Sequence, residues 1–186
     1  MSNYTAEDEK LINEAWEKLV ESCKKICKGE ESWNMIKRAY FLAKEAHSGV
    51  RRRSGEPYML HPIAVAQIAV DEIGLGSKSV VAALLHDVVE DTYITFEQLE
   101  KEFSDNVIQA LKLLTHDDSV DYMDYVRKLK DNPIARSVKL EQITKIAAKY
   151  GITEDDIELY GKYKAKIHLD KLASDKKDAK LILVTA

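Results

Sequence analysis

The sequence predicts an all-α fold, and three observations support this prediction. Apolar residues recur along most of the chain with the 3.6-residue period of amphipathic helices. Only 7 Gly and 3 Pro occur among the 186 residues, fewer than a protein with many tight turns needs. Period-2 alternation never extends beyond a few residues, so the one strand expected is the apolar run Lys180–Ala186, which we assign to a tail.

The first half of the chain predicts four helices. Gly29 ends the first, Pro62 occupies the favoured first turn of the third, and Ser77 is expected to cap the fourth. A loop rich in Gly, Ser, Arg and Pro separates the second helix from the third. The predicted ranges are 6–28, 32–47 and 61–73, with the fourth helix running from Ser77 through His86 and Asp87.

The second half continues the helical pattern. Thr95 and Gln98 have the spacing of a capping box, which predicts a short helix to about Phe103. Asn132-Pro133 marks a helix start and Gly151 marks its stop. Further helices are predicted over 104–114, 120–130, 133–149 and 153–173. The chain is therefore expected to be a single domain over 1–186, with an N-terminal helix (1–30), a helical core (31–173) and a tail (174–186).

The composition is that of a soluble globular protein. The net charge of −4 gives no overall basic field, so no nucleic-acid partner is expected. No 18-residue apolar run occurs, so no membrane association is expected, and the acidic N-terminus lacks the features of a signal peptide. A cytoplasmic location is the resulting expectation. Cys23 and Cys27 are one helical turn apart, but no second Cys/His pair completes a metal site, so reduced packing thiols are expected.

Residues 81–91 carry the strongest functional signal. An apolar run leads to His86-Asp87, and Glu90-Asp91 follows one helical turn later. On a continuous helix these four side chains share one strip. Burying three carboxylates and an imidazole without partners would be very unfavourable, and a divalent cation is the simplest partner that satisfies them together. The alternative is a solvated acidic helix end.

One helix cannot surround an ion, so further ligands must come from elsewhere. His61, at a helix start, is the best candidate outside the strip, although a histidine at such a position can equally be a cap or a surface residue. Two imidazoles and one carboxylate suit Mn²⁺, Fe²⁺ or Zn²⁺. The loop Arg51-Arg52-Arg53-Ser54 supplies local positive charge suited to phosphates. Its alternative interpretation is a solvated surface loop.

Three segments together resemble a known family. They are Ala46-His47-Ser-Gly, the stretch Arg52-Arg-Ser-Gly-Glu-Pro-Tyr-Met-Leu-His61-Pro62, and Leu85-His-Asp-Val-Val-Glu-Asp-Thr92. At this separation they resemble the HD-domain hydrolases of guanosine tetra- and pentaphosphate, (p)ppGpp. This family comprises the hydrolase halves of long Rel/Spo-type enzymes and the stand-alone small alarmone hydrolases of the stringent response. The resemblance runs from about residue 35 to 140, and residues 153–170 rejoin it.

The resemblance implies an HD-domain helical bundle with the metal site between helices. It implies Mn²⁺ held by His61, His86 and Asp87, with Glu90 and Asp91 as catalytic residues beside a water molecule on the metal. It further implies that Arg52, Arg53 and Ser54 lie near the bound nucleotide, whose 3′-diphosphate is released as pyrophosphate. His47 also matches the family, and we interpret it as structural.

The family's second motif, Lys-Leu-Ala-Asp-Leu-x-x-Asn, is altered here. Lys139-Leu140 begins it as expected, but Gln142 stands at the position of the Asp that provides the fourth ligand and Ile146 at that of the Asn that contacts the nucleoside. Gln142 shares an inward stripe with Ala135, Val138 and Ile146. Its neutral amide, or Glu141 about 100° round the helix, would be only a weak fourth donor.

Two hypotheses follow. The first is a metal-dependent phosphohydrolase similar to guanosine 3′,5′-bis(diphosphate) 3′-pyrophosphohydrolase. The second is a catalytically impaired HD-domain protein that binds a nucleotide or a protein partner, which the changes at Gln142 and Ile146 favour. The broad apolar stripe of the N-terminal helix is compatible with packing on its own core or with a homo-oligomer.

Overall fold

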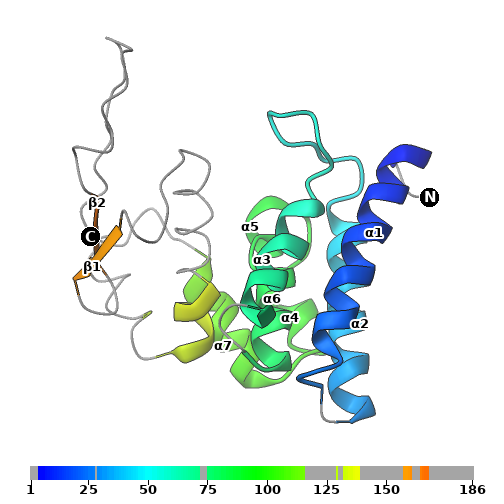
Figure 1. The fold of residues 1–186 in the computed structure, drawn as a ribbon. Coiled ribbons are helices and arrows are strands. Elements are labelled where there is room, and N and C mark those ends of the chain that lie inside the picture. The colour runs from blue at the N-terminus through cyan, green and yellow to red at the C-terminus, as the bar shows by residue number, and fades with distance from the viewer. Residues whose placement is uncertain are drawn as a thin grey trace, which may run out of the picture.

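A computed structural model describes residues 4–27, 29–71, 75–115, 129 and 132–138, together with the backbone of two short strands further along the chain. Residues 133–138 are helical. The labelled elements, shown in Figure 1, are α1 (Ala6–Cys23), α2 (Glu30–Ala46), α3 (Leu60–Asp71), α4 (Ser77–Leu85), α5 (Val88–Asp91), α6 (Phe96–Leu99), α7 (Asp105–Leu114), β1 (Ile157–Tyr160) and β2 (Lys164–Ile167).

Helix α4 forms the centre of the helical bundle. Every residue from Ser79 to Leu85 is buried, as expected for a helix that is apolar on all sides. It packs against α2, α3 and α7, while α1 packs against α3. The residues that follow α4 therefore emerge from the interior of the bundle, and their placement depends on this packing.

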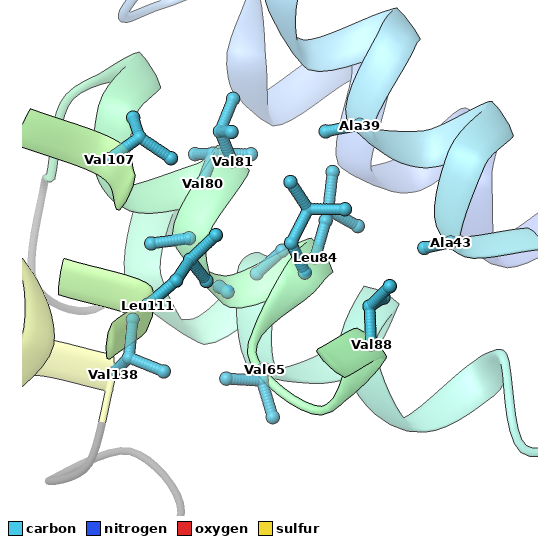
Figure 2. Close-up of a cluster of buried hydrophobic side chains, with 14 of the residues drawn as sticks. Ala39, Ala43, Val65, Val80, Val81, Leu84, Val88, Val107, Leu111 and Val138 are labelled. Atoms are coloured by element: carbon cyan, nitrogen blue, oxygen red, sulfur yellow. The ribbon is translucent and has the colours of Figure 1, made fainter. Parts of the chain in front are cut away.

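The core around α4 is filled by aliphatic side chains from several helices. Leu84 lies beside Ala39 and Ala43 of α2, whose short side chains allow close approach, and Leu111 of α7 packs on another side (Figure 2). Val138 belongs to the same cluster. Part of the chain near residue 138 thus completes the core formed by α2, α3, α4 and α7.

The N-terminal helix packs on the chain's own core. Thr5 and Asp8 form a capping box at its start. Its apolar stripe includes Ile12, Leu19 and Cys23, all fully buried. Burial raises the pKa of the Cys23 thiol to about 12, and both cysteines are free, in agreement with their prediction as packing thiols.

The sequence located most helices of the described part correctly. Predicted helices 32–47, 61–73 and 104–114 correspond to α2, α3 and α7 with small differences at their ends. The capping box at Thr95 and Gln98 is formed. None of the helices in the described ranges has both the length and the apolar character needed to cross a membrane.

The all-α prediction is confirmed, with one local exception. The helix predicted over 153–173 is wrong where the structure describes that range, because β1 and β2 pair there as an antiparallel hairpin. Its register places Ile157 opposite Ile167 and Tyr160 opposite Lys164. The predicted helix over 120–130, the part of helix 133–149 after residue 138, and the run Lys180–Ala186 lie outside the described residues, apart from Leu129.

Candidate metal centre

Three predicted metal ligands converge where α3, α4 and α5 meet. His61 lies in the first turn of α3, His86 directly follows α4, and Asp87 directly precedes α5. One ligand atom from each residue lies within 4.8 Å of the other two. Asp87 Oδ2 is 2.8 Å from His86 Nε2 and 3.6 Å from His61 Nε2. The packing of α3 on α4 therefore assembles two imidazoles and one carboxylate as the sequence predicted.

The four polar groups of 86–91 do not lie on one continuous buried strip. Helix α4 ends at Leu85, and α5 begins at Val88 after a turn at His86 and Asp87. His86 is 3% exposed, whereas Glu90 and Asp91 are exposed. The expectation that all four groups are buried together is wrong, because the turn directs only the first pair inward.

The hydrogen bonding of His86 fits a metal ligand. Its Nδ1 lies 2.8 Å from the carbonyl oxygen of Ala83. Because a carbonyl only accepts, this contact assigns the proton of the neutral ring to Nδ1. Nε2 then directs a lone pair toward the Asp87 carboxylate, and it is buried without a hydrogen-bond donor among the described residues. A cation between the two atoms would bind both of them. In metal-bound histidines the other ring nitrogen usually donates to a carbonyl or carboxylate, as Nδ1 does here.

Asp87 is held in its ionised form. Burial alone would raise its pKa, but the adjacent imidazoles of His86 and His61 and the Tyr58 hydroxyl together outweigh burial and lower the pKa to about 2. The side chain retains 20% exposure. Asp87 is therefore an anionic oxygen donor that remains accessible from outside.

Tyr58 is a site residue that sequence reasoning did not assign. Its hydroxyl donates to Asp87 Oδ2 at 2.5 Å and lies 3.0 Å from Asp91 Oδ2. Its ring packs against those of His47 and His61, with centroids 4.7 and 5.8 Å away. Tyr58 stands within the segment that carries the family resemblance, but no helical spacing relates it to Asp87, 29 positions later.

His47 lies beside this cluster but outside the three converging ligands. It is 1% exposed, and neither ring nitrogen has a hydrogen-bond partner among the described residues. Burial is the main cause that lowers its pKa, although the carboxylates of Asp87 and Asp91 oppose this effect. Its backbone oxygen accepts a hydrogen bond from the Tyr4 hydroxyl. The ring is a neutral, buried group that packs behind Tyr58.

The arginine loop is closed by backbone hydrogen bonds. The Tyr58 N–H donates to the Val50 carbonyl, and Arg51 and Pro57 form an antiparallel bridge. Gly55 has φ of +88°, a conformation that L side chains rarely adopt. The loop projects beyond the neighbouring helices (Figure 1).

The three arginines of this loop have different surroundings. Arg51 stabilises the fold, since it donates hydrogen bonds to the buried Asp8 carboxylate at 2.5 Å and to the Gly55 carbonyl at 2.6 Å. Arg52 lies 3.6 Å from the Glu56 carboxylate, a separation that permits exchange with another anion. Arg53 and Ser54 are exposed. The predicted phosphate contacts at Arg52, Arg53 and Ser54 are therefore available to a ligand.

The predicted fourth donor belongs to the altered second motif. Gln142, Glu141 and Ile146 lie outside the described residues. Ala135 and Val138, the first two members of their predicted stripe, are fully buried in the core. The inward stripe is thus confirmed as far as residue 138.

The family follows from a match to a known domain. A family model described as an HD domain matches residues 39–151, which include all three converging ligands. The chain belongs to the HD domain family.

Known relatives are similar to this chain over about half of its length. A putative GTP diphosphokinase, RSH1, of Arabidopsis thaliana is 43% identical over 107 residues, which are 57% of this chain and 12% of the relative. The bifunctional (p)ppGpp synthase/hydrolase SpoT of Escherichia coli K12 is 39% identical over 95 residues, 51% of this chain and 13% of that protein. The matched part of this chain thus spans about an eighth of their length.

A solved structure supports the same assignment. It is described as a metazoan orthologue of SpoT that hydrolyses ppGpp, and it matches with a TM-score of 0.53 and 28% identity, covering 65% of this chain and 76% of that one. The predicted resemblance to the Rel/Spo-type hydrolase domain is confirmed.

A second family model matches the C-terminal part of the chain. It is described as formate–tetrahydrofolate ligase and matches residues 129–186. The two matches overlap over residues 129–151. Gln142 and Ile146, where the HD hydrolase motif is altered, lie inside this overlap.

Proposed function

We propose that this chain is a metal-dependent phosphohydrolase that cleaves guanosine 3′,5′-bis(diphosphate) at its 3′ position and releases pyrophosphate. The observation that carries the proposal is the convergence of His61, His86 and Asp87, with His86 Nε2 2.8 Å from the Asp87 carboxylate. Relatives named as (p)ppGpp hydrolases or 3′-pyrophosphohydrolases support the substrate and the reaction.

A divalent cation would be held by the Nε2 atoms of His61 and His86 and by Asp87. Mn²⁺ is our leading assignment, with Fe²⁺ and Zn²⁺ as alternatives, because two imidazoles and one carboxylate suit each of them. When bound, the ion supplies Lewis acidity and lowers the pKa of water. Gln142 or Glu141 remains a proposed weak fourth donor.

Glu90 and Asp91 are the proposed proton acceptors. Both are exposed one turn beyond Asp87, where a water molecule and a substrate can approach. The link from Asp91 through the Tyr58 hydroxyl to Asp87 ties one of them to the metal ligands. In the proposed reaction a water oxygen attacks the phosphorus attached to the ribose 3′ oxygen and the bond between those two atoms breaks. The carboxylate accepts the water proton, and the departing ribose oxygen takes up that proton.

Arg52, Arg53 and Ser54 are the proposed phosphate-binding residues. The guanidinium groups would pair with phosphate oxygens, and the planar Arg group can also stack on a base. Arg52 would exchange its contact with Glu56 for the ligand. A local basic loop would thus attract the nucleotide in a chain of net charge −4.

The second candidate is a catalytically impaired HD-domain protein that binds a nucleotide or a protein partner. It is favoured by Gln142 and Ile146, which replace the family's fourth ligand and nucleoside contact. Both residues also lie in the segment 129–186 that matches the second family model. A cytoplasmic location, a homo-oligomeric state and the absence of nucleic-acid and membrane partners remain predictions.

The two functions are separated by metal content and turnover of the full chain. We expect about one Mn²⁺ per chain and Mn²⁺-dependent release of pyrophosphate and GDP from guanosine tetraphosphate. His86→Ala should lose both, whereas Glu14→Gln, on the exposed face of α1, should retain both. Nucleotide binding without turnover by the metal-loaded wild type would establish the impaired alternative.

A further inference from the structure

The Tyr58 hydroxyl lies between the carboxylates at the two ends of α5. Asp87 precedes this short helix and Asp91 is its last residue. The oxygen of Tyr58 is 2.5 Å from Asp87 Oδ2 and 3.0 Å from Asp91 Oδ2. One side chain from the loop before α3 therefore connects a metal ligand with a proposed proton acceptor.

Tyr58 is fixed on several sides. Its backbone N–H donates to the Val50 carbonyl at 2.9 Å, and its carbonyl accepts from the His61 N–H at 2.8 Å. Its ring packs against the buried His47 ring and edge-on to His61. A residue anchored through both its backbone and its ring can hold a flexible carboxylate in one orientation.

A single hydroxyl proton can serve only one carboxylate at a time. The hydroxyl lies within hydrogen-bond distance of both carboxylates and is the donor to each. The shorter distance directs this proton toward Asp87 Oδ2, the same oxygen that lies near both ligand histidines. A cation shared with that oxygen would weaken it as an acceptor and favour donation to Asp91.

We propose that Tyr58 is a positioning residue that holds the Asp91 carboxylate beside the metal ligands. Its hydroxyl donates its hydrogen bond to Asp91 once a divalent cation binds Asp87. The catalytic consequence rests on the proposed function, whereas the link between Tyr58 and Asp91 is a property of the fold. The inference assigns to Tyr58 a role in orienting the proton acceptor rather than in binding the metal.

The first test is a double-mutant cycle on thermal unfolding of the full chain, measured with and without saturating Mn²⁺. Tyr58→Phe keeps the ring contacts and removes only the hydroxyl. With Mn²⁺ it should lower the unfolding midpoint by roughly 3–8 °C, the shift expected for one hydrogen bond to a charged group. In an Asp91→Asn background this shift should fall by at least half. Tyr93→Phe, at an exposed tyrosine two residues after α5, is the control and should leave the unfolding midpoint unchanged.

The second test separates positioning from metal binding. Tyr58→Phe should leave the Mn²⁺ dissociation constant within about threefold and KM within about threefold, while kcat falls roughly 10–100-fold, the range seen when a supporting residue is lost. In the Asp91→Asn background the same substitution should change kcat less than about twofold.

Three results would overturn the inference. The first is an equal shift of the unfolding midpoint by Tyr58→Phe in the wild-type and Asp91→Asn backgrounds with Mn²⁺ bound. The second is a tenfold or greater loss of Mn²⁺ affinity in Tyr58→Phe, and the third is an equal fold-loss of kcat by Tyr58→Phe in both backgrounds. A wild-type chain that binds Mn²⁺ but does not turn over would contradict the proposed function alone, and the unfolding cycle would still decide on Tyr58.

Discussion

Two regions of the chain were expected to contribute ligands to one metal site, and they differ in their structure and in how well they match the family's motifs. In the proposed metal-site region, residues 58–91, the three proposed ligands lie at the ends of α3, α4 and α5, and α3 packs on the buried α4. In the C-terminal region, residues 129–186, the chain matches two families over its first part and contains the β1–β2 hairpin. The family motif is complete in the first region and altered in the second. The two regions therefore differ in how completely they carry the family's ligand motifs.

The largest expected effect is at the centre of the metal-site region. His86→Ala removes a buried donor whose Nδ1 is already fixed by the Ala83 carbonyl. Since loss of a supporting residue alone costs metal affinity about 10–100-fold, we expect loss of a ligand to cost at least about 100-fold. Titration calorimetry with Mn²⁺ measures this directly. An unchanged Mn²⁺ affinity would show that His86 is not a ligand, and the two regions would then not differ in this way.

The next effect concerns the exposed carboxylates. Asp91→Asn and Glu90→Gln should each lower kcat, and the residue that acts as general base should lower it by roughly 10²–10⁴-fold. Mn²⁺ affinity should stay within about threefold, because neither residue belongs to the three converging ligands. Steady-state kinetics alongside calorimetry separates the two quantities. Full activity in both variants would exclude this pair from catalysis.

A smaller effect is expected from the buried His47. Its pKa is lowered by burial, so the unfolded state binds more protons below its ordinary value near 6.5. The contribution of neutral His47 to stability is therefore complete above pH 6.5 and is lost as the pH falls, with a slope of up to about 1.4 kcal/mol per pH unit. Urea unfolding of the metal-free protein between pH 7.5 and 5 should show a shallower decline for His47→Gln than for wild type. If the free energy of unfolding declined equally with pH in both proteins, His47 would not be the cause of the pH dependence.

The smallest effect is expected in the C-terminal region. If Gln142 occupied the fourth ligand position, Gln142→Asp would add a charged donor and tighten Mn²⁺ binding by about tenfold or more, since a site's affinity rises with its ligand charge. We expect this tightening because Gln142 is a proposed weak fourth donor, and a change of less than about threefold would exclude it from the site. Restored binding and turnover in Gln142→Asp would instead support the catalytically impaired HD domain.

The sequence identified three residues that converge in the structure, because each stands at the end of a locally recognisable helix. An apolar helix ending in His86-Asp87 and a helix start at His61 are both visible as local patterns, and packing of α3 on α4 brings them together. The turn after Leu85 was missed because His86 and Asp87 keep right-handed helical dihedral angles and no Gly or Pro marks it. Burial of all four polar groups was consequently overestimated.

Two further features could not be predicted for different reasons. The contact of Tyr58 with Asp87 joins residues 29 positions apart, and no periodicity relates a loop residue to a helix end. The β1–β2 hairpin was missed because each strand has only four residues, too few for a period-2 pattern to be distinguished from a helix. Long, strongly periodic helices were the easiest elements to predict.

The central claim is that His61, His86 and Asp87 bind one divalent cation. A crystal structure of the full chain grown with Mn²⁺, with data collected to locate the anomalous scattering of manganese, tests it most directly. The account predicts one strong anomalous peak in contact with His61 Nε2, His86 Nε2 and an Asp87 carboxylate oxygen, and its loss in His86→Ala. A metal-saturated crystal with no peak at these three atoms would contradict the account.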